Sequence, residues 1–169
     1  MEKFEFDDIS FSEDTRILYE GHHINGMNLA PEAFPLFMTS AFNMGNLDDV
    51  EHTYDTKGYT YIRTRNPNRK ALADVLTYLE QGKDTLIFSS GMGAITTTYF
   101  ALLQPGDHMI CNENIYGETF DAITSLVKNY GVTTTFVPFD DLDAVKAAVQ
   151  PNTKMLYTEV ASNPTDRLC

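Results

Sequence analysis

The stretch Phe88-Ser89-Ser90-Gly91-Met92-Gly93-Ala94-Ile95-Thr96 joins an apolar run to a helix-compatible segment. Residues 85–88 predict a strand, and residues 94–103 predict a helix. A strand that turns directly into a helix leaves backbone N–H groups free at the positive end of the helix dipole. Glycine lets an anion approach these groups closely. The stretch therefore indicates a phosphate site, with an ordinary turn that needs small residues as the alternative.

Helix and strand patterns alternate along the chain after residue 66. Asn66 predicts an N-cap, with Pro67 at the first helical position. Further helix patterns cover residues 118–130 and 142–149, and strand patterns cover 108–111, 132–137 and 155–160. This alternation is typical of βαβ units. We expect an α/β fold, a mainly parallel sheet with helices on both faces and ligands at the carboxyl ends of its strands.

Residues 1–58 show no regular pattern and predict an extended arm with one short helix. The arm begins with a cluster of acidic residues, which we interpret as solvated: Glu2, Glu5, Asp7, Asp8, Glu13 and Asp14. The α/β domain is expected over residues 59–169.

Composition excludes several classes of protein. The net charge of −12 and the pI near 4.5 disfavour a nucleic-acid partner, which selects for basic surfaces. No run approaches the length of a membrane span, and the first residues lack the pattern of a signal peptide. Cys111 and Cys169 form neither a metal-binding nor a disulfide pattern. We therefore expect no metal, no membrane and a cytoplasmic location.

A second candidate phosphate ligand is the segment Tyr59-Thr60-Tyr61-Ile62-Arg63-Thr64-Arg65. If it is extended, its two alternate tyrosines and two arginines share one face. Guanidinium groups and phenols together suit a phosphate, because arginine offers a rigid fork of donors. A solvated edge strand is the alternative.

Other residues allow a functional and a structural interpretation. Gly91-x-Gly93 with Glu113 at the next strand's end resembles a dinucleotide site, but Thr96 replaces the third glycine. Tyr116 follows a strand and is suited to stack on a planar cofactor and transfer a proton, or simply to pack. The histidines, His22, His23, His52 and His108, are interpreted as structural or solvated. The acidic residues Asp140, Asp141 and Asp143 predict a helix N-terminus.

Several motifs together resemble one family. They are Tyr61-Ile62-Arg63-Thr64-Arg65-Asn66-Pro67, Leu79-Glu80, Ser89-Ser90-Gly91-Met92-Gly93-Ala94-Ile95, Pro105-Gly106-Asp107-His108, Tyr116-Gly117-Glu118-Thr119, Pro151-Asn152-Thr153-Lys154, Glu159 and Asn163-Pro164-Thr165. Their order and spacing resemble the Cys/Met-metabolism family of pyridoxal-phosphate enzymes. This family includes cystathionine gamma-synthase, cystathionine lyases, methionine gamma-lyase and acylhomoserine sulfhydrylases. The resemblance covers residues 59–165.

The resemblance implies a fold like the large domain of aspartate aminotransferase and a role for each matching residue. Ser90, Gly91 and Met92 are implied to hold the phosphate of pyridoxal 5'-phosphate. Tyr61 and Arg63 are implied to reach the phosphate of a neighbouring subunit, which implies a homo-oligomer.

The resemblance assigns the remaining site residues to the pyridine ring of the cofactor. Tyr116 is implied to stack on the ring and to transfer a proton at the leaving group. Asn163 is implied to bond the ring hydroxyl, with Glu159 in support. The implied substrate is a sulfur-containing amino acid, in lyase or γ-replacement chemistry.

In that family the Schiff-base lysine lies beyond the Asn-Pro-Thr segment, and no lysine of this chain matches its motif. We therefore expect residues 59–169 to be an incomplete cofactor domain and the chain to be an inactive N-terminal fragment of a larger enzyme. The alternative is a catalytically dead relic or a half-domain that acts by oligomerisation. A nucleotide-binding domain is a further alternative.

Overall fold

The computed structural model describes residues 12–19, 33–163, 166 and 168. These residues divide into two compact units, within Met1–Ile87 and Phe88–Cys169. The expected acidic start of the arm, apart from Glu13 and Asp14, and the histidines His22 and His23 lie outside the described residues.

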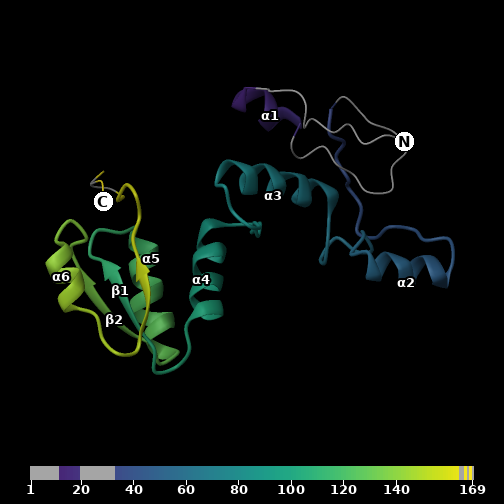
Figure 1. Ribbon diagram of the computed structural model, residues 1–169. Helices are drawn as coiled ribbons and strands as arrows, with labels where there is room; N and C mark the ends of the chain where they lie inside the picture. The colour runs from purple at the N-terminus through teal and green to yellow at the C-terminus, as the bar shows by residue number, and fades with distance from the viewer. Residues whose placement is uncertain (1–11, 20–32, 164–165, 167, 169) are drawn as a thin grey trace. The chain divides into compact units, whose positions relative to one another are not determined.

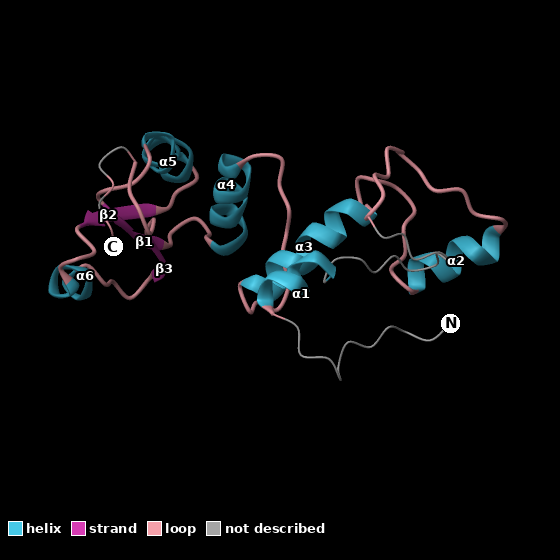
Figure 2. Ribbon diagram, turned by 90° about the horizontal axis from the view of Figure 1, so that it is seen from above, coloured by secondary structure: helices cyan, strands magenta, loops and turns pink. Residues whose placement is uncertain are grey.

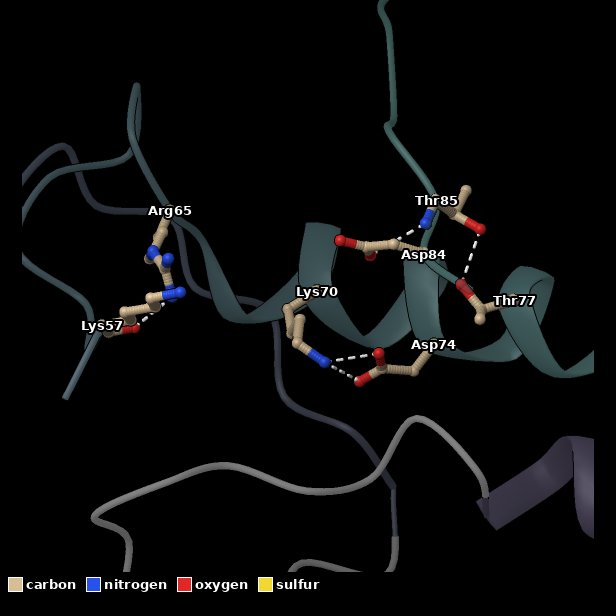
Figure 3. A network of polar contacts seen from close by, with 7 residues as sticks. All are labelled: Lys57, Arg65, Lys70, Asp74, Thr77, Asp84 and Thr85. Carbon is tan, nitrogen blue, oxygen red and sulfur yellow. Dashed lines mark hydrogen bonds and ion pairs between the residues drawn. The ribbon is translucent and has the colours of Figure 1, made fainter. Parts of the chain in front are cut away.

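The described residues of the first unit form three helices, α1 (Glu13–Tyr19), α2 (Leu47–Asp55) and α3 (Pro67–Leu79). The arm thus has two described helices where one was expected. Helix α3 begins as predicted, because the Asn66 side chain accepts a hydrogen bond from the Arg69 amide and Pro67 follows it. Around α3, as Figure 3 shows, Lys70 pairs with Asp74, and the hydroxyls of Thr77 and Thr85 lie 2.6 Å apart.

Two predictions for the first unit's later residues are wrong. Residues 85–88 form a loop instead of a strand, and the side chain of Leu86 is 79% exposed. A strand needs a neighbour to pair with, and apolar character alone does not supply one.

The segment that carries Tyr61 and Arg63 is likewise a turn and is not extended. The amide and the hydroxyl of Thr64 both donate to the Tyr61 carbonyl, at 3.0 and 2.8 Å, and close the turn locally. The predicted shared face of four alternating side chains is therefore absent.

The second unit is a parallel α/β layer that begins with α4 (Gly91–Leu102). It continues with β1 (His108–Asn112), α5 (Gly117–Ala122), the π-helix η2 (Ile123–Val127) and β2 (Thr133–Val137). Helix α6 (Leu142–Ala147) and β3 (Thr153–Tyr157) complete it (Figure 1). The predicted alternation is confirmed. However, α4 begins three residues early, the helix after β1 contains a π segment, and β3 starts and ends earlier than expected.

The strands are parallel and lie in the order β2-β1-β3. From β1 the chain moves to β2 on one side of it, and from β2 it moves back across β1 to β3 on the other side. The two connections thus run in opposite directions across the sheet. Right-handed connections therefore place α5 and α6 on opposite faces. Figure 2 shows this arrangement, which confirms helices on both faces of the sheet.

The buried core of the second unit lies between β1 and the helices α4 and η2. Its members are Tyr99, Leu103, Met109, Cys111, Ile115, Ile123, Val127 and Val132. The opposite face of β1 carries His108, which is fully buried. Its two ring nitrogens lie 2.8 Å from the Thr153 hydroxyl and 2.9 Å from the Thr135 hydroxyl. Burial lowers the pKa of His108. The histidine thus links all three strands, and of the two interpretations, structural or solvated, the structural one holds for His108.

Candidate functional site

The strand-to-helix stretch forms a capped helix start. Ser90 is the N-cap of α4, and its hydroxyl accepts a hydrogen bond from the Gly93 amide at 3.0 Å. The amides at the first turn of a helix have no partner within the helix, and the dipole makes this end positive. A Cβ built on Gly91 meets no atom within 4 Å. The start of α4 therefore presents amides and an open side to an anion.

Tyr116 lies at the carboxyl end of β1, as predicted, and is the N-cap residue of α5. Its side chain makes no capping hydrogen bond and is 40% exposed. The Tyr116 amide donates to Glu159 Oε2 at 3.0 Å. The Tyr116 ring is thus partly open to solvent, while the Tyr116 amide is held by Glu159, which follows β3.

Glu159 follows β3 and connects several elements. Its Oε1 lies 3.5 Å from the Thr119 hydroxyl of α5 and 3.4 Å from the Tyr157 hydroxyl of β3. The Thr119 hydroxyl also lies 3.9 Å from Met92 Sδ in α4. These contacts bring Met92, Tyr116 and Glu159 together, although 43 residues separate the last two in sequence.

The carboxylate of Glu159 affects the titration of buried groups beside it. Burial, with Glu159 adding to it, raises the pKa of the Cys111 thiol to about 12. Burial and Glu159 also raise the pKa of Tyr157. Cys111 is therefore a protonated core thiol and is not a candidate nucleophile.

The other predicted site residues are Asn163, Tyr61 and Arg63. Asn163 is exposed in a turn after β3, and no described contact joins it to Glu159. Tyr61 and Arg63 belong to the first unit, where the Arg63 guanidinium lies 5.0 Å from the centre of the Tyr61 ring. Arg69, which the sequence did not single out, donates to the carbonyls of Ile62 and Arg63 at 3.1 and 3.3 Å and holds this turn.

The described part of the chain contains no group of three or more His, Cys, Asp or Glu side chains that could hold a metal. No helix in it is both long and apolar enough to span a bilayer.

Comparison with known proteins identifies the relatives of this chain. The model of the Cys/Met metabolism PLP-dependent enzyme family matches residues 14–169. A cystathionine beta-lyase of Bacillus subtilis is 43% identical over 131 residues, which are 78% of this chain and 32% of that protein. An L-methionine gamma-lyase of Treponema denticola is 34% identical over 139 residues, which are 81% of this chain and 35% of that protein.

A solved structure resembles the fold. It is described as an O-acetylhomoserine (thiol)-lyase of Campylobacter jejuni and contains a pyridoxyl-lysine phosphate. The TM-score is 0.81 at 27% identity, covering 94% of this chain and 40% of that one. The chain thus spans about a third of the length of the two curated relatives described above.

Proposed function

The chain belongs to the Cys/Met-metabolism family of pyridoxal-phosphate (PLP)-dependent enzymes, and from this membership we propose that it forms the cofactor-binding part of a trans-sulfuration enzyme. The proposed reaction is C–S lyase or γ-replacement chemistry on a sulfur-containing amino acid, in the cytoplasm. The observation that carries the proposal is the convergence of the α4 start, Tyr116 and Glu159 within one unit. Family membership also favours PLP over a nucleotide cofactor.

The residues at the start of α4 fit a phosphate. The Ser90 hydroxyl caps the Gly93 amide, while Gly91 and Met92 occupy the first helical positions. Open space beside Gly91 leaves room for the anion. A phosphate there accepts hydrogen bonds from amides that have no partner within the helix and is stabilised by the helix dipole.

PLP, when bound, supplies an electron sink that lets a substituent on the β or γ carbon of an amino acid leave. Tyr116 is proposed to stack on the ring and to hold or move a proton at the leaving group through its hydroxyl. Asn163 is proposed to donate a hydrogen bond to the ring hydroxyl. Glu159 is proposed to lie near Asn163 and to support it.

Tyr61 and Arg63 are proposed to bind the phosphate held by a neighbouring subunit, which makes the functional form a homo-oligomer. Their exposure supports this role, because both side chains remain available to a partner. The Arg63 guanidinium is held near the Tyr61 ring, and such a pair presents its remaining donors in a fixed direction.

We further propose that no lysine of this chain forms the covalent link to PLP. Such a lysine needs a positioned and desolvated amine. The described lysines are all exposed: Lys57, Lys70, Lys83, Lys128, Lys146 and Lys154. Two of them are engaged in ion pairs, Lys70 with Asp74 and Lys146 with Asp143. By this proposal the 169 residues alone are inactive.

Co-expression with the C-terminal remainder of the Bacillus subtilis relative tests the proposed function. The expected result is a complex that binds PLP and cleaves a sulfur amino acid, with Tyr116→Phe impaired in turnover more than in PLP binding. A well-formed complex without PLP or activity would instead support the alternative, a relic or an oligomerisation half-domain.

A further inference from the structure

Two hydrogen bonds join the end of β1 and the loop that follows it to the residues after β3. The Asn112 side-chain amide donates to the Thr158 hydroxyl at 3.2 Å, and the Tyr116 amide donates to the Glu159 carboxylate at 3.0 Å. The first bond holds Asn112, the last residue of β1, from which the loop continues. The second bond holds Tyr116, whose ring is proposed to stack on the cofactor.

The tie to Glu159 is the stronger kind of bond. A hydrogen bond to a carboxylate is shorter and stronger than one between neutral groups. Glu159 is half-buried, so water competes less for its oxygen atoms than at the surface. Its second oxygen lies within 3.5 Å of the hydroxyls of both Thr119 and Tyr157, which orients the carboxylate.

This contact holds the Tyr116 amide, while the Tyr116 carbonyl accepts a hydrogen bond from the Phe120 amide at 3.0 Å and the side chain caps nothing. Its φ of −57° and ψ of 137° place it outside the helix that it precedes. Since backbone angles restrict which rotamers a side chain can adopt, holding the Tyr116 amide also narrows the directions in which the ring can point.

We propose that Glu159 is a positioning residue, which fixes the Tyr116 backbone so that the ring is aimed at the cofactor before the cofactor binds. This inference rests on the proposed role of Tyr116. It gives Glu159 a second role beside the implied one of supporting Asn163. Glu159 acts as a hydrogen-bond acceptor whose charge strengthens the bond, so a glutamine that keeps the acceptor oxygen retains much of this role.

The test uses the 169-residue chain, labelled with ¹⁵N, and three variants. Glu159→Ala removes the acceptor, Glu159→Gln keeps an acceptor oxygen without the charge, and Thr158→Val removes the neighbouring tie as a matched control. The readouts are hydrogen exchange of the Tyr116 amide and the Kd for pyridoxal phosphate from equilibrium dialysis. Thermal unfolding confirms that each variant is folded.

We expect Glu159→Ala to speed exchange of the Tyr116 amide about tenfold and to weaken PLP binding about tenfold, as loss of one bond to a charged group implies. Glu159→Gln restores both to within about threefold of the parent chain, since a neutral bond of this kind keeps much of the interaction. Thr158→Val leaves exchange at Tyr116 unchanged.

Unchanged exchange in a folded Glu159→Ala chain overturns the inference, and so does a Glu159→Gln chain that behaves like the alanine variant. If the parent chain binds no PLP, the proposed function fails instead. Amide exchange then still decides whether Glu159 holds Tyr116.

Discussion

We expect the replacement of Gly91 with valine to weaken cofactor binding while it leaves the stability of the fold nearly unchanged. A Cβ at Gly91 meets no atom within 4 Å, so the site has room for a Cβ. Valine is also a better helix former than glycine by a few tenths of a kcal/mol, so we expect the stability to change by less than about 0.5 kcal/mol. The added branches instead fill the open side at which a phosphate approaches the first amides of α4.

The expected loss of affinity follows from those amides. Each hydrogen bond to a charged group contributes about 1.5–3 kcal/mol, and displacing the phosphate from two of them costs roughly 3–6 kcal/mol. This corresponds to a Kd for PLP that is roughly 10²- to 10⁴-fold higher. Equilibrium dialysis of the variant with PLP measures it, and urea unfolding measures stability.

Gly93→Ala is the matched control, because its Cβ meets the Ser90 hydroxyl at 2.9 Å. That variant should lose stability as well as affinity, since the N-cap bond is disturbed. A folded Gly91→Val chain that binds PLP as tightly as the parent would refute the phosphate site.

Three further predictions concern the cap, the buried histidine and the lysines. Ser90→Ala should cost about 1 kcal/mol of unfolding free energy and weaken PLP binding, whereas Asn46→Ala, at the similar cap of α2, should cost a similar amount without affecting PLP. Unfolding measured across pH should show full stability above pH 6.5 and a loss as pH falls from there through the lowered pKa of His108, because the unfolded chain takes up the proton first. His108→Gln should flatten this dependence, and an unchanged profile would contradict it. When the chain is mixed with PLP and treated with borohydride, mass spectrometry should find no single lysine labelled stoichiometrically. Full labelling of one lysine would contradict the proposal that no lysine of this chain links to PLP.

Local signals in the sequence predicted most of the second unit and the start of α3 in the first unit. The N-cap at Asn66, the helix after Gly91 and the three parallel strands depend on neighbouring residues and on short-range periodicity. The helix start at Ser90, where we propose the phosphate site, was predicted for the same reason, since all of its parts lie within a few residues.

The errors concern features that depend on distant or competing contacts. Residues 85–88 have a strand-like composition, but pairing requires a neighbouring strand. The segment around Tyr61 alternates like a strand, but bonds from Thr64 close it into a turn. The contact between Tyr116 and Glu159 spans 43 residues, so no local pattern could have indicated it.

The most direct test of the proposed cofactor site is a titration of the ¹⁵N-labelled chain with pyridoxal phosphate, followed by amide chemical shifts. We expect saturable shifts concentrated at Gly91, Met92 and Tyr116, because the phosphate is proposed to bind at the start of α4 and the ring to lie against Tyr116. Saturable binding with shifts elsewhere and none at Gly91 or Met92 would contradict it.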